Sequence, residues 1–127
     1  MFALTMEDGP VLNVKSRQHQ FTYAVDGSLP NPLEATYAAI TGCAGVYARK
    51  ACMGLGISPA GIEINTKPTA RPGNPLLPAK ITTQLRFPAH ITAEAREAIL
   101  ASVLQCPVKN LISQGNEVDF IFDVVSD

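Results

Sequence analysis

The sequence predicts an α+β domain in which helices pack on a mostly antiparallel sheet. Short segments that alternate apolar and polar residues, as strands do, occur near the start, in the middle and at the end of the chain. One long helical segment, apolar nearly all round, separates the first strands from the next. Two shorter helices precede the last strand, so strands and helices come in runs, which is typical of the α+β class.

The N-terminal segment is predicted to form a short β-meander. A first strand, Phe2 to Met6, is followed by the turn signal EDGP and by VLNVK, in which Leu12 and Val14 alternate with polar residues. The polar stretch SRQHQ turns the chain. The segment FTYAV then repeats the alternation, with Phe21, Tyr23 and Val25 on one face.

A long helix is predicted from Leu33 to about Leu55. Pro32 suits the first helical position, Asn31 suits the N-cap, and the glycines of GLG end the helix. One apolar stripe is accompanied by alanine and threonine on the opposite side, so we expect burial from both sides. In so small a chain this implies a second subunit, and therefore a homodimer. The stripe consists of Leu33, Tyr37, Ile40, Ala44 and Tyr47.

The middle of the chain is predicted to form two further strands. GIEINTKPTA has the Ile62/Ile64 alternation of a half-exposed strand, and RPGNPLLP is a proline-rich loop or a hairpin end. The next strand, AKITTQLRF, places Ile81, Thr83, Leu85 and Phe87 on one face.

The last third of the chain is predicted to contain two helices and a strand. Thr92 caps a helix that runs to Leu104 and Gln105, with Glu94 and Glu97 near its positive end. The segment EVDFIFDVV closes the chain as a strand.

The stretch LQCPVKN places Cys106 directly before a proline. The residue before a proline avoids the α region, whereas proline suits the first position of a helix. Cys106 is therefore predicted to be the N-cap of a short helix through Val108, Leu111 and Ile112. Its sulfur would face unpaired N–H groups, which favour a thiolate. The alternative is a buried cysteine that acts as a small apolar residue.

Length and composition predict one domain over residues 1–127. The chain is 46% hydrophobic and 17% charged with a formal net charge of −1, which gives no electrostatic reason to expect nucleic acid or anionic membrane as a partner. Its apolar-rich stretch, Ala35 to Ala48, is too short to span a bilayer, and no secretory signal is visible. Three cysteines, an odd number, favour free thiols in a reducing cytoplasm.

The long helix carries two of the three cysteines. Cys43 lies too far from the helix end to be activated by the dipole, and a buried thiol would be inert. Gly42 and Gly45 beside it, however, let a backbone or a small ligand approach closely. Cys52 is about half a turn out of phase and roughly 13 Å further along the axis, so it cannot bridge to Cys43. If a pair exists, it is Cys43 with Cys106.

Together, NPLEATYAAITGC and CPVKN resemble the OsmC/Ohr family of thiol peroxidases (osmotically inducible protein C and organic hydroperoxide resistance protein). The resemblance covers roughly Phe21 to Asp123. It implies an intertwined homodimer with sites at the subunit interface, organic hydroperoxides as substrates, a dithiol reductant, a role as an antioxidant in the oxidative stress response, and no cofactor. It also implies that Cys43 attacks the peroxide and that Cys106 resolves the sulfenic acid as a disulfide. Cys52, which its helix position keeps from Cys43, is expected to be structural.

Three positions depart from the family pattern. Lys109 stands where the second motif often has histidine, and Leu33 stands where hydroperoxide-resistance members have glutamate, with Glu34 following it. Family members hold the thiolate with an arginine from the N-terminal half, and Arg17 is the candidate because no other arginine precedes the long helix. These departures favour the alternative function, a non-catalytic OsmC-like dimer that binds an apolar small molecule at the subunit interface.

Other chemistries have weaker support in the sequence. His19 and His90 are far apart and, with the scattered cysteines, show no metal-ligand spacing. A Cys–His hydrolase lacks a visible orienting residue, and no glycine-rich phosphate loop is present. Between the two thiols, the dipole favours Cys106 as the more acidic one, whereas the resemblance makes Cys43 the nucleophile, and we follow the resemblance.

Overall fold

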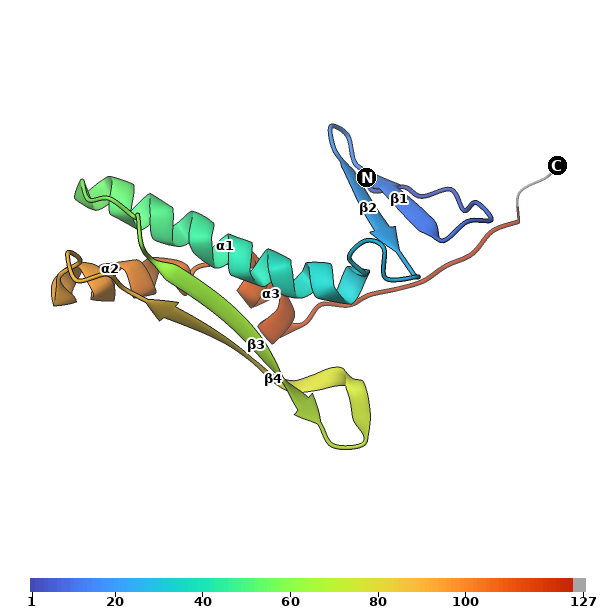
Figure 1. Ribbon diagram of the computed structural model, residues 1–127. Coiled ribbons are helices and arrows are strands. Elements are labelled where there is room, and N and C mark those ends of the chain that lie inside the picture. Colours follow the sequence, from blue (N-terminus) through green and yellow to red (C-terminus); the bar gives the residue numbers. More distant parts are fainter. Residues whose placement is uncertain (125–127) are drawn as a thin grey trace. The chain divides into compact units, whose positions relative to one another are not determined.

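A computed structural model describes residues 1–124 of the chain (Figure 1). Both pairs of strands are antiparallel hairpins, β1 with β2 and β3 with β4, so the fold is α+β as predicted. Within the described residues, no helix combines the length and apolar character that crossing a membrane requires. In chain order the elements are β1 (Val11–Lys15), β2 (Gln20–Ala24), α1 (Pro32–Leu55), β3 (Glu63–Arg71), β4 (Asn74–Arg86), α2 (Ala93–Val103) and α3 (Pro107–Gln114).

The chain divides into two compact units. The first contains Met1–Gly42 and Glu63–Arg86, and the second contains Cys43–Ile62 and the residues from Phe87 onward. The helix α1 is continuous and contributes to both units. All three cysteines belong to the second unit, because that unit begins with Cys43.

The hairpin of β1 and β2 lies in the first unit. Leu12 lies opposite Tyr23 and Val14 lies opposite Phe21. Both predicted strands are confirmed, although β2 begins and ends one residue earlier than its alternation indicated.

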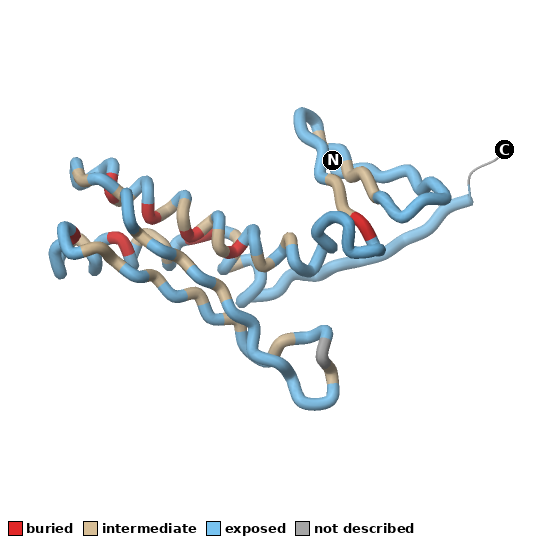
Figure 2. The backbone as a smooth tube through the Cα atoms, viewed as in Figure 1, coloured by how far each residue is buried: buried red, intermediate tan, exposed pale blue. Residues whose placement is uncertain are grey.

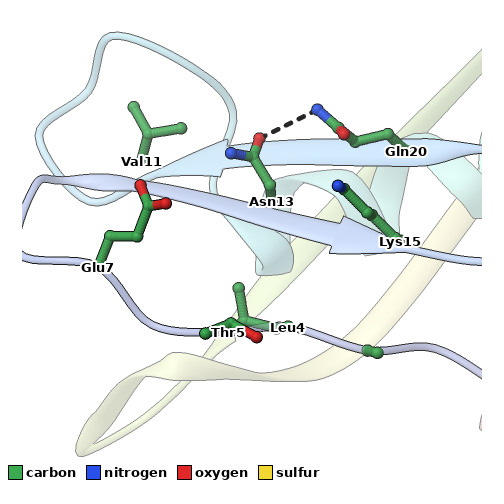
Figure 3. A pocket seen from close by; sticks show the side chains of 8 residues that line it. Leu4, Thr5, Glu7, Val11, Asn13, Lys15 and Gln20 are labelled. Atoms are coloured by element: carbon green, nitrogen blue, oxygen red, sulfur yellow. Dashed lines mark hydrogen bonds between the residues drawn. The ribbon is translucent and has the colours of Figure 1, made fainter.

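The strand predicted at Phe2–Met6 is not formed. Ala3 exchanges two backbone hydrogen bonds of 2.9 Å with Lys15, the last residue of β1, and this is an isolated bridge. The chain beyond Ala3 stands apart from β1 across a recess of about 250 Å³, so residues 4–6 have no strand partner there (Figure 3). The recess is lined by Ala3, Leu4, Thr5, Glu7, Val11, Asn13, Lys15 and Gln20.

The hairpin of β3 and β4 also lies in the first unit. Ile64 lies opposite Leu85, and half-buried residues alternate with exposed ones over residues 63–67 of β3 and 81–86 of β4, as predicted. Pro72 and Gly73 make the turn, where Gly73 has a φ of 80° that glycine adopts without strain. The segment RPGNPLLP is therefore the end of a hairpin rather than a loop, and β4 already begins within it.

Three threonine hydroxyls join α1 to this hairpin. The hydroxyl of Thr41 on α1 lies 2.7 Å from that of Thr66 on β3, which lies 3.0 Å from that of Thr83 on β4. The half-buried face of the hairpin therefore contacts the first part of α1.

Both ends of α1 are where the sequence placed them. The side-chain oxygen of Asn31 accepts a hydrogen bond of 2.8 Å from the backbone N–H of Glu34, and the next residue, a proline, opens the helix. At the other end Gly56 has a φ of 70°, and the N–H of Ile57 donates to the carbonyl of Cys52 at 3.0 Å. These features make a Schellman motif.

Within residues 1–124, α1 is buried along one stripe (Figure 2). Away from this stripe, Val46 is 62% exposed and Met53 is 60% exposed. Burial from a second side requires another chain and stays a prediction. The buried stripe consists of Ile40, Ala44, Ala48 and Cys52, spaced four residues apart.

The helix α2 packs in the second unit. The hydroxyl of Thr92 accepts a hydrogen bond of 3.2 Å from the N–H of Ala95, which confirms the predicted N-cap. Ile99 is fully buried, and the hydroxyl of Ser102 donates to the backbone carbonyl of Tyr47 on α1 at 3.0 Å. The helix ends slightly before its predicted end.

The strand predicted at residues 117–125 is wrong over its described part. Residues 117–124 form neither helix nor strand, and Val125 lies outside the described residues. A strand persists only where a neighbour satisfies its backbone N–H and C=O groups, and no described strand of this chain pairs with the segment. The side chains of Phe120, Ile121 and Phe122 are 94–95% exposed.

Candidate active site

Cys43 lies in α1 and is half-buried. The helix surface beside it is open, because a Cβ atom added at Gly42 would meet, within 4 Å, no described atom beyond its chain neighbours and the backbone of its own helix. Helix packing thus leaves this thiol partly accessible, as the neighbouring glycines led us to expect.

Cys106 is the N-cap of α3, as predicted from CPVKN. Its backbone carbonyl accepts the first helical hydrogen bond, of 3.1 Å, from the N–H of Asn110. The side chain is 2% exposed and makes no capping hydrogen bond. Its sulfur therefore remains available to another partner.

That partner is Cys43. The side chain of Cys106 and the backbone N–H of Val108 both lie close enough to the sulfur of Cys43 to alter its pKa, the first upward and the second downward. All three cysteines are free thiols. Two thiols that are far apart in sequence thus lie side by side at the start of α3.

The pKa of the Cys43 thiol is raised above the ordinary thiol range. Burial is the largest cause, and the hydrogen bond to Cys106 is the next. The N–H of Val108 acts in the opposite direction because it stabilises the negative sulfur. A negative charge on Cys106 would raise the pKa further. The two thiols therefore resist carrying negative charge at the same time.

Cys52 is fully buried, and burial raises the pKa of its thiol. Its backbone carbonyl takes part in the C-terminal cap of α1. These properties fit a packing residue, as predicted. Within residues 1–124, no three side chains of His, Cys, Asp or Glu gather as a metal ion would require.

The other two predicted site residues lie in the first unit. Glu34 is exposed in the first turn of α1. Arg17 is exposed in the turn between β1 and β2. Because the thiols belong to the second unit, the roles expected for Glu34 and Arg17 stay predictions.

The sequence analysis missed one group beside Cys43, the backbone N–H of Val108, which lowers the pKa of that thiol. Its signal was present in the motif CPV. Proline at the first helical position has no N–H, so the first amide that this helix can present belongs to the following residue.

The apolar pocket expected at a subunit interface would need a second chain, so its existence stays a prediction. Its expected lining residues are buried or half-buried: Ile40 is 7% exposed, and Tyr37 and Tyr47 are intermediate. The recess in Figure 3 is a different feature, since its lining comes from the N-terminal arm and the β1–β2 hairpin and contains no cysteine.

The family model described as OsmC-like protein matches residues 25–120. The chain belongs to the OsmC-like protein family. This confirms the resemblance inferred from the two cysteine motifs. Members of the OsmC/Ohr family are often cysteine peroxidases linked to stress responses.

Solved structures share the fold of this OsmC-like chain. An OsmC-like protein from Mycoplasma pneumoniae is 14% identical, with a TM-score of 0.67 over 89% of this chain and 86% of that one. A hypothetical protein from Aquifex aeolicus is 18% identical, with a TM-score of 0.68 over 90% and 86%. The organic hydroperoxide resistance protein OhrB of Bacillus subtilis is 17% identical, with a TM-score of 0.50 over 87% and 90%. No curated protein matches the chain.

Proposed function

We propose that this chain is a cysteine-based peroxidase that reduces organic hydroperoxides through a Cys43–Cys106 sulfenic acid and disulfide cycle. The observation that carries the proposal is the proximity of the two thiols, of which Cys106 raises the pKa of Cys43. A sulfenic acid condenses readily with a thiol held next to it, and the cycle needs neither metal nor flavin.

In the first step, the thiolate of Cys43 attacks the outer oxygen of a hydroperoxide ROOH. The new S–O bond forms as the O–O bond breaks, and the alkoxide leaves as the alcohol ROH after it takes up a proton. The sulfur is oxidised by two electrons to the sulfenic acid, and the peroxide is reduced by the same two electrons.

In the second step, the thiolate of Cys106 attacks the sulfur of the sulfenic acid on Cys43. The S–S bond forms, the S–O bond breaks, and hydroxide leaves as water after it takes up a proton. An external dithiol then reduces the disulfide by thiol exchange and is itself oxidised. Two protons return with the two thiols.

Exposure supports this order of attack. Cys43 is half-buried beside open helix surface, whereas Cys106 is 2% exposed. A peroxide from solution therefore reaches Cys43 more readily, and Cys106 is placed to meet the oxidised neighbour rather than the substrate.

Arg17 and Glu34 complete the proposed machinery. Arg17 would hold the thiolate of Cys43, and Glu34 would stand in for the glutamate that hydroperoxide-resistance members have one position earlier. Both are exposed, so neither is committed to the core of this chain. Lys109, where the family often has histidine, is also exposed.

The working form that we propose is a homodimer. The segment 117–124 leaves Phe120, Ile121 and Phe122 almost fully exposed, and α1 exposes Val46 and Met53. Such apolar surface is costly in water and is well suited to pairing with a second copy. The interface would then supply the apolar pocket for the alkyl or aryl group of the peroxide. We place this activity in the reducing cytoplasm, where a dithiol reductant is available.

One observation favours the second candidate, a non-catalytic dimer that binds an apolar small molecule. The raised pKa of Cys43 keeps its thiol protonated near neutral pH, and a protonated thiol is a poor nucleophile. In that case the pocket would bind its ligand without oxidation of either cysteine.

Thiol titration distinguishes the two candidates. The reduced protein is treated with one equivalent of cumene hydroperoxide, and free thiols are counted before and after. The peroxidase should lose two thiols per chain, and mass mapping should join Cys43 to Cys106 while Cys52 stays free. Retention of all three thiols, together with saturable binding of cumyl alcohol, would establish the binding function instead.

A further inference from the structure

The end of the β3–β4 hairpin, residues 71–78, carries two exposed leucines (Figure 1). Leu76 is 71% exposed and Leu77 is 54% exposed. Both belong to β4, in which the apolar residues Ile81 and Leu85 are half-buried. Packing among the described residues therefore does not account for the two leucines at the hairpin end.

A bulge in β4 presents these leucines. Ala70 on β3 lies opposite Pro78, whereas the next residue of β3, Arg71, lies opposite Asn74. Residues 75–77 therefore have no opposite residue on β3. The side-chain oxygen of Asn74 accepts a hydrogen bond of 3.2 Å from the N–H two residues further on, inside the bulge. A bulge redirects the side chains that it contains, so this one displays apolar groups at the hairpin end.

The charge of the same hairpin is unbalanced. The whole chain has 11 acidic and 10 basic residues, but residues 64–92 contain no Asp or Glu. Arg86, at the other end of the hairpin, lies 3.6 Å from Glu63. The remaining Lys and Arg residues of the hairpin are exposed and form no salt bridge within residues 1–124. They are Lys67, Arg71 and Lys80.

The two lysines are neighbours on one face of the hairpin. Lys67 lies opposite Thr82 and Lys80 lies opposite Thr69, and all four residues are exposed. The lysines are thus diagonal neighbours, close enough for their charges to repel each other. An anionic partner would remove this repulsion.

We propose that the hairpin end docks on an anionic lipid surface. Leu76 and Leu77 enter the boundary between headgroups and acyl chains, and the three cations lie among the headgroup phosphates. Peripheral binding of this kind combines buried apolar area with attraction to anionic lipids, and both are present at this end of the hairpin. The cytoplasmic leaflet carries the negative charge that such cations attract. The near-neutral net charge of the whole chain conceals this local excess of positive charge.

Two features favour a lipid surface over nucleic acid. Residues 64–86 contain no aromatic side chain on which a base could stack. Phosphate contacts to a nucleic acid would also leave the two leucines in water, whereas a bilayer interface takes up both cations and leucines.

Flotation with vesicles measures the docking. The full-length protein is mixed with vesicles of phosphatidylcholine and phosphatidylserine, or with vesicles of phosphatidylcholine alone. The wild type should float with the anionic vesicles and not with the neutral ones, and added salt should release it. Absence of binding to the anionic vesicles overturns the proposal. Equal binding to both compositions also overturns it, because the cations would then have no part in docking.

The cations are tested by substitution. Each Lys or Arg near an anionic surface strengthens binding about fivefold, so Lys67→Gln/Lys80→Gln should weaken it roughly 25-fold. The matched control is Arg49→Gln/Arg96→Gln, which removes two exposed cations from α1 and α2 and should bind like the wild type. Equal losses in the two variants would mean that only net charge matters, and the proposal would be wrong.

The leucines are tested with a fluorescent probe. The chain has no tryptophan, so a single introduced one reports on its own surroundings. The emission of Leu77→Trp should shift to the blue on anionic vesicles and should be quenched by lipids with brominated acyl chains. Gln84→Trp, at an exposed position of β4 away from the bulge, is the control and should show neither effect. An unshifted emission from vesicle-bound Leu77→Trp refutes insertion of the hairpin end.

Two other occupants of this surface predict different results. If a second copy covers the leucines, Leu76→Ser/Leu77→Ser should convert dimer to monomer in light scattering, and the wild type should bind no vesicles. If a nucleic acid is the partner, a labelled oligonucleotide should bind the wild type and this variant equally, again without vesicle binding. Either result overturns the proposal.

Docking uses neither Cys43 nor Cys106, so it is independent of the proposed peroxidase cycle. Cys43→Ser should therefore float with anionic vesicles like the wild type. Loss of flotation in Cys43→Ser would contradict a docking surface confined to the hairpin. A wild type that floats but consumes no peroxide would refute the peroxidase function and leave the docking intact.

Discussion

The hydroxyl of Thr41 on α1 lies 2.7 Å from the hydroxyl of Thr66 on β3, and this contact connects a helix with a strand that follows it in the chain. Thr66→Val should remove the contact and also the 3.0 Å contact to Thr83. We expect the free energy of unfolding in urea to fall by about 1 kcal/mol. Thr82→Val, an exposed position on the opposite face, is the control and should change little. Equal stability of the two variants would contradict this prediction.

A second hydrogen bond holds α2 against α1. Ser102→Ala removes the donor to the carbonyl of Tyr47 and should lower the free energy of unfolding by about 1 kcal/mol. The matched control is Ser113→Ala, because Ser113 lies exposed on α3. Urea denaturation of both variants checks the expectation, which fails if the control loses as much stability as Ser102→Ala.

Stability should fall with rising pH above about 8.5, the ordinary thiol range. Burial raises the pKa of Cys52 in the folded chain, so the unfolded chain loses this proton first. Where the unfolded state binds fewer protons, the free energy of unfolding decreases as pH rises. Cys52→Ala should make this decrease less steep in urea denaturation at a series of pH values. Parallel curves for the two proteins would exclude the buried thiol as a cause.

Substitution of Cys43 and substitution of Cys106 should stop the peroxidase cycle at different steps. Cys43→Ser should abolish the consumption of cumene hydroperoxide. Cys106→Ser should reduce one equivalent and stop as a sulfenic acid, which dimedone traps on Cys43. Cys52→Ala is the control and should turn over like the wild type. A first-turnover burst in Cys43→Ser and none in Cys106→Ser would reverse the roles.

The exposed C-terminal segment tests the homodimer. Phe122 is 94% exposed within one chain, so Phe122→Glu should cost nothing in a monomer. If the segment pairs with a second copy, the buried charge should convert dimer to monomer in light scattering. Gln18→Glu, an exposed charge in the β1–β2 turn, is the control and should leave the dimer intact. A monomeric wild-type protein at micromolar concentration would refute the dimer.

The sequence by itself determined the elements whose formation depends on local interactions. Asn31, Thr92 and Cys106 were identified as N-caps because a cap depends on a few neighbouring backbone groups. The long helix and the β3–β4 hairpin were predicted from the spacing of their apolar residues. Glycines marked the end of α1 and the Pro72–Gly73 turn of the hairpin. The family followed from the two cysteine motifs.

Only the tertiary structure decided whether distant segments meet. The strands predicted at Phe2–Met6 and at residues 117–125 had suitable patterns, but a strand requires a partner at the right distance, which a local pattern does not supply. The proximity of Cys43 on α1 to Cys106 and Val108 at the start of α3 is likewise a relationship between segments far apart in the chain. The sequence analysis named this pair as the candidate, but spacing along the chain does not fix how two helices approach each other.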